Sequence, residues 1–235
     1  MGAINNMAGA AGAIGLIALE MAGGLGTVTA NASLRLGALA IGIAGLVGFK
    51  SRGQAIPPRA WIYGLLAIPG AIAGAWLAVS LPVWVYRSVL ITILLAVLTQ
   101  QLRNRTPDPS TKIETTRWWP LLFLLIGLHM GFIQVAAGLL SILVLTTLHR
   151  QDLVATNAAK MAIMICAAGA AVVYFASAGK IEWGPAAALA TGCGAGSFWA
   201  SRWSIDKGHA RVRLVVLAIT VTVLLWAMWQ ITTTS

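Results

Sequence analysis

The sequence predicts an all-α polytopic membrane protein built from two inverted repeats of four segments each, and three observations favour this class. The 235-residue chain is 59% hydrophobic and 9% charged, with a mean hydropathy of +0.85, which excludes an ordinary soluble domain. Similar motifs recur in its two halves, and its basic residues are concentrated in short polar connections. The net charge of +10 therefore indicates membrane topology, and nucleic acid is not expected as a partner.

The first repeat, residues 1–102, contains four apolar segments. Pro57 and Pro58 separate the second from the third, because proline lacks an N–H donor and restricts the residue before it. Residues 103–117 are the longest polar stretch and are predicted to form a cytoplasmic linker between the repeats. The four segments are approximately Gly2–Leu25, Val28–Phe49, Ala60–Ser80 and Val83–Leu102.

The second repeat, residues 118–235, opens with the most informative segment of the chain. From Trp118 to His149 there is no Asp, Glu, Lys or Arg, a run of about 32 residues where one bilayer span needs about 20. The run is too long for one span and too short for two, so we expect a re-entrant pair of half-helices turning between Gly131 and Gly138. One long tilted helix is the alternative. The later segments are approximately Leu153–Ala178, Trp183–Ala200 and Leu214–Ile231.

The two halves align with each other. Four residues of the third segment recur 122 positions later, which is 183 minus 61 for the first pair. They are Trp61, Gly70, Gly74 and Ala78, which correspond to Trp183, Gly192, Gly196 and Ala200. With small gaps, GAINNMAG pairs with GFIQVAAG, and ANASLR pairs with ATNAAK, so that Asn5 corresponds to Gln134 and Arg35 to Lys160. Internal repetition of this kind is usual in secondary transporters.

Charge placement indicates how the repeats lie in the membrane. If segments one and five re-enter, the basic connections after segments two, four, five and seven fall on one face, which the positive-inside rule makes cytoplasmic. If all eight segments crossed, these connections would be divided between the two faces. Each half is therefore expected to cross three times, and an odd number of crossings makes the halves inverted copies.

Two cations are the main candidates for function. Arg35 and Lys160 lie about seven or eight residues into their helices, and the cores of these segments hold no acidic residue. A charge at that depth is costly and usually faces a partner or a cavity. We therefore expect the two cations, one from each half, to bind an anion together. Snorkelling towards the interface, or capping of carbonyl groups at a hairpin tip, is the alternative.

Polar residues near the two cations are further candidates. Asn5, Asn6 and Gln134 lie at the expected hairpin tips, where free backbone N–H groups favour anions, although amides also bond between helices. His129 is a candidate proton relay because histidine titrates near neutrality, and a packed, hydrogen-bonded histidine is the alternative. Four residues lie about one turn from the cations, where they can donate to an oxyanion or bond to their own helix. They are Asn31, Ser33, Thr156 and Asn157.

The sequence contains no nucleophile paired with a base, no metal-ligand cluster and no phosphate loop. We therefore expect neither an enzyme nor a protein with a metal or cofactor. The remaining alternatives to a carrier are an anion channel and a membrane scaffold that transports nothing.

The motifs GFIQVAAG, ANASLR and ATNAAK, and a GKIEW turn followed by a G-x-x-x-G helix, resemble those of the TauE/SafE family of sulfite and organosulfonate permeases. The chain departs from the family where glycine runs commonly follow the turn, since it has AAGLLS there. The resemblance implies a multi-pass carrier in the cytoplasmic membrane for a small sulfur-containing anion, such as sulfite, sulfoacetate or a related sulfonate. It also implies that the anion is often exported, with protons as a candidate coupling ion. A homodimer is left open.

Overall fold

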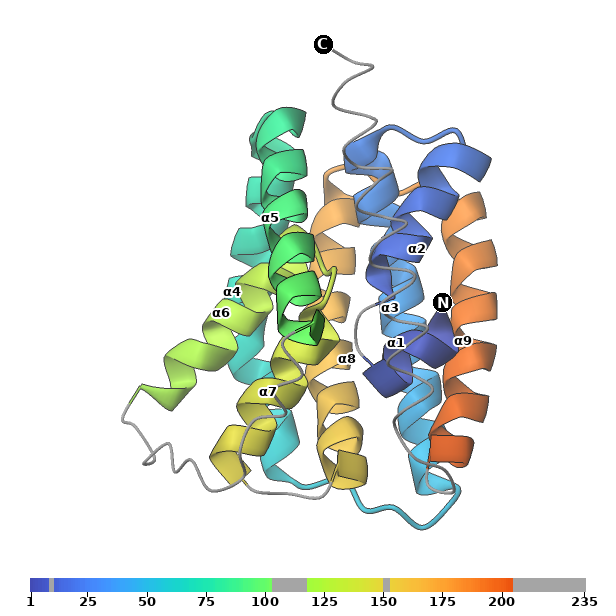
Figure 1. Cartoon of the computed structure of the whole chain (residues 1–235). Coiled ribbons are helices and arrows are strands. Elements are labelled where there is room, and N and C mark those ends of the chain that lie inside the picture. Colours follow the sequence, from blue (N-terminus) through green and yellow to red (C-terminus); the bar gives the residue numbers. More distant parts are fainter. Residues whose placement is uncertain (9–10, 103–117, 150–152, 205–235) are drawn as a thin grey trace.

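The computed structural model describes residues 1–8, 11–102, 118–149 and 153–204, and this part of the chain consists of helices and turns with no strand (Figure 1). Its elements are α1 (Gly2–Ala8), α2 (Gly12–Ile17), the π-helical turn η1 (Ala18–Ala22), α3 (Thr27–Lys50), α4 (Arg59–Ser80), α5 (Val83–Leu102), α6 (Trp119–Phe132), α7 (Ala137–His149), α8 (Leu153–Ser177) and α9 (Trp183–Ser204). The predicted linker, residues 103–117, and the predicted eighth segment, Leu214–Ile231, lie outside the described residues.

Three of these helices, α3, α4 and α8, are long and apolar enough to cross a membrane. Shorter apolar helical stretches in the described chain include α6 and parts of α5 and α7. Long apolar helices joined by short polar connections are typical of a multi-pass membrane protein, which confirms the predicted all-α membrane class.

The fifth segment is broken, as its length and composition predict. Helix α6 ends at Phe132 and α7 begins at Ala137, so the break lies between Gly131 and Gly138. Gln134 and Ala136 both have φ of 60°, a left-handed conformation that side chains other than glycine rarely adopt and that a continuous helix excludes. One long helix over this segment is therefore not formed. The first segment is also divided, into α1, α2 and η1.

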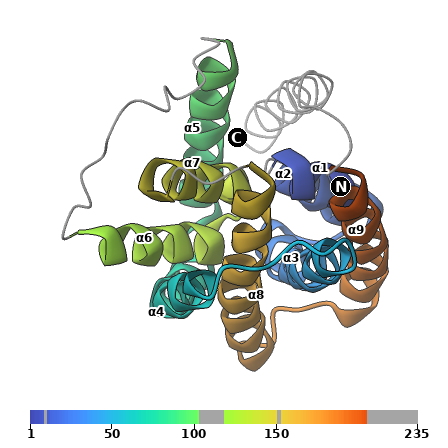
Figure 2. The ribbon, with the colours of Figure 1, turned by 90° about the horizontal axis from the view of Figure 1, so that it is seen from below.

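The long helices form a row in the order α4, α8, α3, α9, as the view from below shows (Figure 2). The broken segments lie on one side of this row. Helix α6 packs on α4, and α7 packs on α8, while α1 packs on α9 and α2 packs on α3. In Figure 1, α6 rises from the lower side to the middle of the molecule and α7 returns to the lower side. The break between α6 and α7 is therefore inside the helical bundle.

Glycines allow α4 and α6 to approach closely. A Cβ atom at Gly70 or Gly74 of α4 would overlap backbone atoms of α6. In the same way, a Cβ atom at Gly127 or Gly131 of α6 would overlap backbone carbonyls of α4. Two small-xxx-small motifs thus face each other, which is a common way for membrane helices to gain van der Waals contact. This packing fixes the end of α6, and with it the break at Gln134.

Candidate anion-binding site

The first cluster is centred on Arg35 of α3, whose side chain is completely buried. Its guanidinium donates hydrogen bonds to three carbonyl oxygens in the last turn of α6 and to two side-chain amide oxygens. The carbonyls are those of Met130 at 2.6 Å, Gly131 at 3.0 Å and Phe132 at 3.1 Å, and the amides are those of Asn31 at 2.8 Å and Gln134. The last carbonyls of a helix have no partner within it and carry the negative end of its dipole. Arg35 therefore caps α6.

The second cluster is centred on Lys160 of α8, which is also completely buried. Its ammonium group donates to the carbonyl of Asn6 at 2.6 Å, the carbonyl of Asn5 at 3.3 Å and the side chain of Asn157 at 2.9 Å. The two carbonyls belong to the last turns of α1. Lys160 thus caps α1 as Arg35 caps α6, and the alternative of carbonyl capping agrees with both clusters.

Each cation reaches across to the other half of the chain. Arg35 holds the broken fifth segment, and Lys160 holds the broken first segment. Among the described residues, neither cation has a carboxylate within ion-pair distance, so only neutral groups compensate the two charges. Backbone carbonyls compensate a full charge only in part, since a helix end carries roughly half an elementary charge. Part of each positive charge is therefore left uncompensated by the described groups.

The two clusters lie at different depths, which differs from the single shared site that the sequence predicts. Helices α3 and α8 are antiparallel, with Gly42 and Gly45 beside Met161. This register places Lys160 about ten residues beyond Arg35 along α3, or roughly 15 Å at 1.5 Å per residue. In this conformation, one small anion cannot contact both cations at once.

Only some of the other predicted residues join the two clusters. Asn31 joins the first, because it accepts from Arg35 and also donates to the carbonyl of Phe132 at 3.0 Å. Ser33 belongs to neither, since its hydroxyl accepts a hydrogen bond from the backbone N–H of Glu182 at 3.0 Å. Thr156 is buried, and its hydroxyl has no hydrogen-bond partner in the described chain.

His129 lies beside the turn of the fifth segment. Its Nε2 atom is 2.7 Å from the carbonyl oxygen of Val135, and the side chain is partly buried. This hydrogen bond closes the left-handed turn around Gln134. The contact agrees with the packed, hydrogen-bonded alternative, and a role in proton relay stays a prediction.

Asn6 has a larger structural role than its place in the sequence indicates. Its side-chain amide donates to the carbonyl and hydroxyl of Ser197, at 3.1 and 2.7 Å, and to the hydroxyl of Ser201 at 2.7 Å. These bonds tie the second cluster to α9. Phe175, whose ring centroid lies 5.7 Å from the Arg35 guanidinium carbon, was not predicted, because an aromatic residue in an apolar segment carries no distinctive signal.

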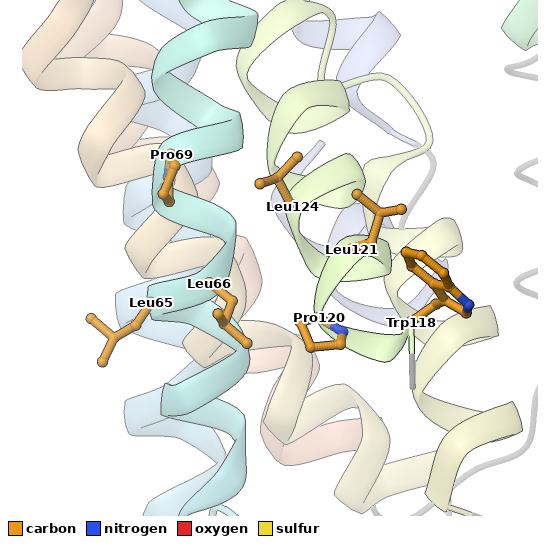
Figure 3. Close-up of a pocket in the computed structure, with 7 residues that line it drawn as sticks. All are labelled: Leu65, Leu66, Pro69, Trp118, Pro120, Leu121 and Leu124. Atoms are coloured by element: carbon orange, nitrogen blue, oxygen red, sulfur yellow. The ribbon is translucent and has the colours of Figure 1, made fainter. Parts of the chain in front are cut away.

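A surface groove between α4 and α6 has a different character (Figure 3). Its volume is about 410 Å³, and its lining consists of Leu65, Leu66, Pro69, Trp118, Pro120, Leu121 and Leu124. Most of these side chains are exposed and all are apolar except for the indole N–H, as expected of a surface that meets lipid. The groove offers no charged group to an anion.

Comparison with known proteins agrees with the resemblance found in the motifs. A family model described as "Sulfite exporter TauE/SafE" matches residues 1–227 of the 235. No curated protein and no solved structure matches the chain. The family consists of transporters, which fits a protein that is not an enzyme. Because the match covers nearly the whole sequence, the chain belongs to the TauE/SafE sulfite exporter family.

Proposed function

We propose that this protein is a secondary transporter that exports a small sulfur-containing anion, such as sulfite, sulfoacetate or a related sulfonate, across the cytoplasmic membrane. The observation that carries the proposal is the pair of completely buried cations, Arg35 and Lys160, with no acidic partner among the described residues. A buried cation without a counter-charge is costly, and a bound anion would supply that charge. Family membership supports the class of substrate.

We further propose that residues 1–102 and 118–235 are inverted repeats. The sequence alignment pairs the start of α1 with the end of α6, and it pairs α2 with α7, α3 with α8 and α4 with α9. If the halves are equivalent, the contact between α3 and α9 should have a counterpart between α8 and α4. The contact between α4 and α6 should likewise have a counterpart between α9 and α1. All four contacts are present (Figure 2). The alignment used none of these contacts, so their agreement supports the repeat.

Individual residues support the same pairing. A Cβ atom at Gly131 would overlap the carbonyl of Ala71, and a Cβ atom at Gly2 would overlap the carbonyl of Cys193. Gly2 is the aligned counterpart of Gly131, and Cys193 is 122 positions after Ala71 by subtraction, as in the other pairs. The same close contact is thus made twice, each time between the two halves of the chain.

The two cations offer a mechanism for coupling anion binding to movement. Each ties the broken segment of one repeat to a core helix of the other, through donors that an oxyanion would also use. An anion that accepts hydrogen bonds from these donors weakens the contact between the broken segment and the core helix. A ligand shifts a conformational equilibrium towards the state that it binds better. Lys160 lies nearer than Arg35 to the basic connection between α3 and α4, so we place it first on the path out of the cytoplasm.

Exchange in proteoliposomes tests the transport proposal. Vesicles loaded with unlabelled sulfite should take up radiolabelled sulfite faster than empty ones, because a carrier returns faster when it is loaded. A pH gradient should change the rate if protons are the coupling ion. Uptake that does not respond to internal sulfite would indicate an anion channel, and uptake equal to that of protein-free vesicles would indicate a scaffold.

Labelling tests the inverted topology. Asp108 and Lys207 lie outside the described residues, and the charge argument places both on the cytoplasmic face. In a variant with Cys166 and Cys193 replaced by alanine, Asp108→Cys and Lys207→Cys should each react with an impermeant maleimide from the cytoplasmic side only. Lys180→Cys, in the exposed turn between α8 and α9, is the control and should react from the other side. Labelling of Asp108→Cys and Lys207→Cys from opposite sides would contradict the model.

A further inference from the structure

A second buried polar group lies at the first cluster and takes part in none of the interactions described above. Tyr86, in the first turn of α5, is only 3% exposed, and its hydroxyl has no hydrogen-bond partner in the described chain. The Nε–H group of Arg35 is also buried without a partner. Buried tyrosine hydroxyls and buried guanidinium N–H groups are normally satisfied. Two unused donors on residues that both contact Phe132 indicate a missing acceptor.

Packing against Phe132 places Tyr86 beside the break after α6. Its ring packs edge-on against the ring of Phe132, with the centroids 5.8 Å apart. The carbonyl of Phe132 in turn accepts hydrogen bonds from Arg35 and from Asn31. The phenol and the guanidinium therefore belong to the same cluster, although α5 and α3 are separate helices.

We propose that Tyr86 is a substrate-binding residue, whose O–H donates to one oxygen of the transported oxyanion while the Nε–H of Arg35 donates to the anion as well. This inference rests on the proposed function and assigns a residue that the sequence motifs do not contain. Arg35 supplies the charge, and Tyr86 adds a donor without adding a second charge. A sulfite or sulfonate group has three oxygens, so it can accept from both donors at the same time.

The competing interpretation is that Tyr86 only packs against Phe132. Tyr86→Phe distinguishes substrate binding by the hydroxyl from packing by the ring, because it keeps the ring and removes only the hydroxyl. Tyr63→Phe is a matched control. Tyr63 is 6% exposed and its ring stacks on Phe123 at 4.2 Å, between α4 and α6, in a different hydrophobic cluster from Tyr86. Both changes remove one phenolic oxygen from a buried aromatic contact.

Sulfite exchange at subsaturating concentration should fall about ten- to a hundred-fold in Tyr86→Phe, the range expected for one hydrogen bond to a charged group. The thermal stability of the variant without anion should be unchanged, and Tyr63→Phe should exchange sulfite at the wild-type rate. Wild-type exchange by Tyr86→Phe would overturn the assignment of Tyr86 and leave the transport proposal standing.

A spectroscopic measurement tests the contact without changing Tyr86. The chain has three tyrosines, so the Tyr63→Phe/Tyr174→Phe variant retains Tyr86 alone. On addition of sulfite, the intensity ratio of the tyrosine Fermi doublet in ultraviolet resonance Raman spectra should shift. The new ratio should approach that of a tyrosine whose hydroxyl donates a hydrogen bond. An unchanged doublet would overturn the inference, even if Tyr86→Phe failed to fold. A shift in a protein that shows no exchange would instead uphold the binding residue and contradict the transport proposal.

Discussion

Gly70→Leu is expected to disrupt the packing of α4 on α6 and to destabilise the protein by about 3 kcal/mol, near the upper end for overpacking. A Cβ atom at Gly70 would overlap the backbone carbonyl of Leu124, and a helix backbone cannot move aside as a flexible side chain can. Separation of the helices would also displace the end of α6, where Arg35 and Gln134 meet. Unfolding of the purified protein in increasing dodecyl sulfate, followed by circular dichroism, measures the effect.

The chain offers a control for this change at the equivalent position of the second repeat. Gly192 is aligned with Gly70, but a Cβ atom there meets nothing within 4 Å among the described residues. Gly192→Leu should therefore unfold at nearly the wild-type detergent concentration. Equal destabilisation by the two substitutions would mean that general intolerance of leucine, and not the contact with α6, explains the loss.

The sequence predicts the break in the fifth segment well because length and polarity limit the choices. About 32 residues without a charge exceed the length of one span of about 20, which favours a broken segment over one long tilted helix, and an amide among them is favourable where the chain turns inside protein. The first segment is harder to predict. It is rich in glycine and alanine, which specify no preferred break, and it forms the short helix α1 where the fifth segment forms the longer α6.

The arrangement of the site follows from helix geometry that the alignment does not contain. Side chains in a helix tilt towards its N-terminus, so on antiparallel α3 and α8 the two cations lean away from each other and form two clusters. Ser33 is two residues before Arg35, and positions two apart do not share a helix face, which explains why it contacts Glu182 instead. The main acceptors of both cations are backbone carbonyls, which leave no signature in a sequence.

Arg35→Ala and Lys160→Ala are each expected to reduce sulfite exchange by about ten- to a hundred-fold or more. One hydrogen bond to a charged group contributes about 1.5 to 3 kcal/mol, and each variant loses more than one such donor. Each variant also leaves helix-end carbonyls buried without a donor, so its unfolding transition should move to lower detergent concentration. Arg35→Lys should be intermediate, because it keeps the charge but loses the fork geometry of the guanidinium.

The double variant and a control at another arginine separate a transport role from a capping role. If the anion passes Lys160 and Arg35 in succession, either loss blocks the path, and Arg35→Ala/Lys160→Ala should exchange no more slowly than the slower single variant. Arg87→Ala removes the same charge from a half-buried position beside Thr27 and should exchange sulfite at nearly the wild-type rate. Exchange by monodisperse Arg35→Ala or Lys160→Ala at the wild-type rate would mean that this cation only caps its helix. The anion would then cross the bundle by contacts with other residues.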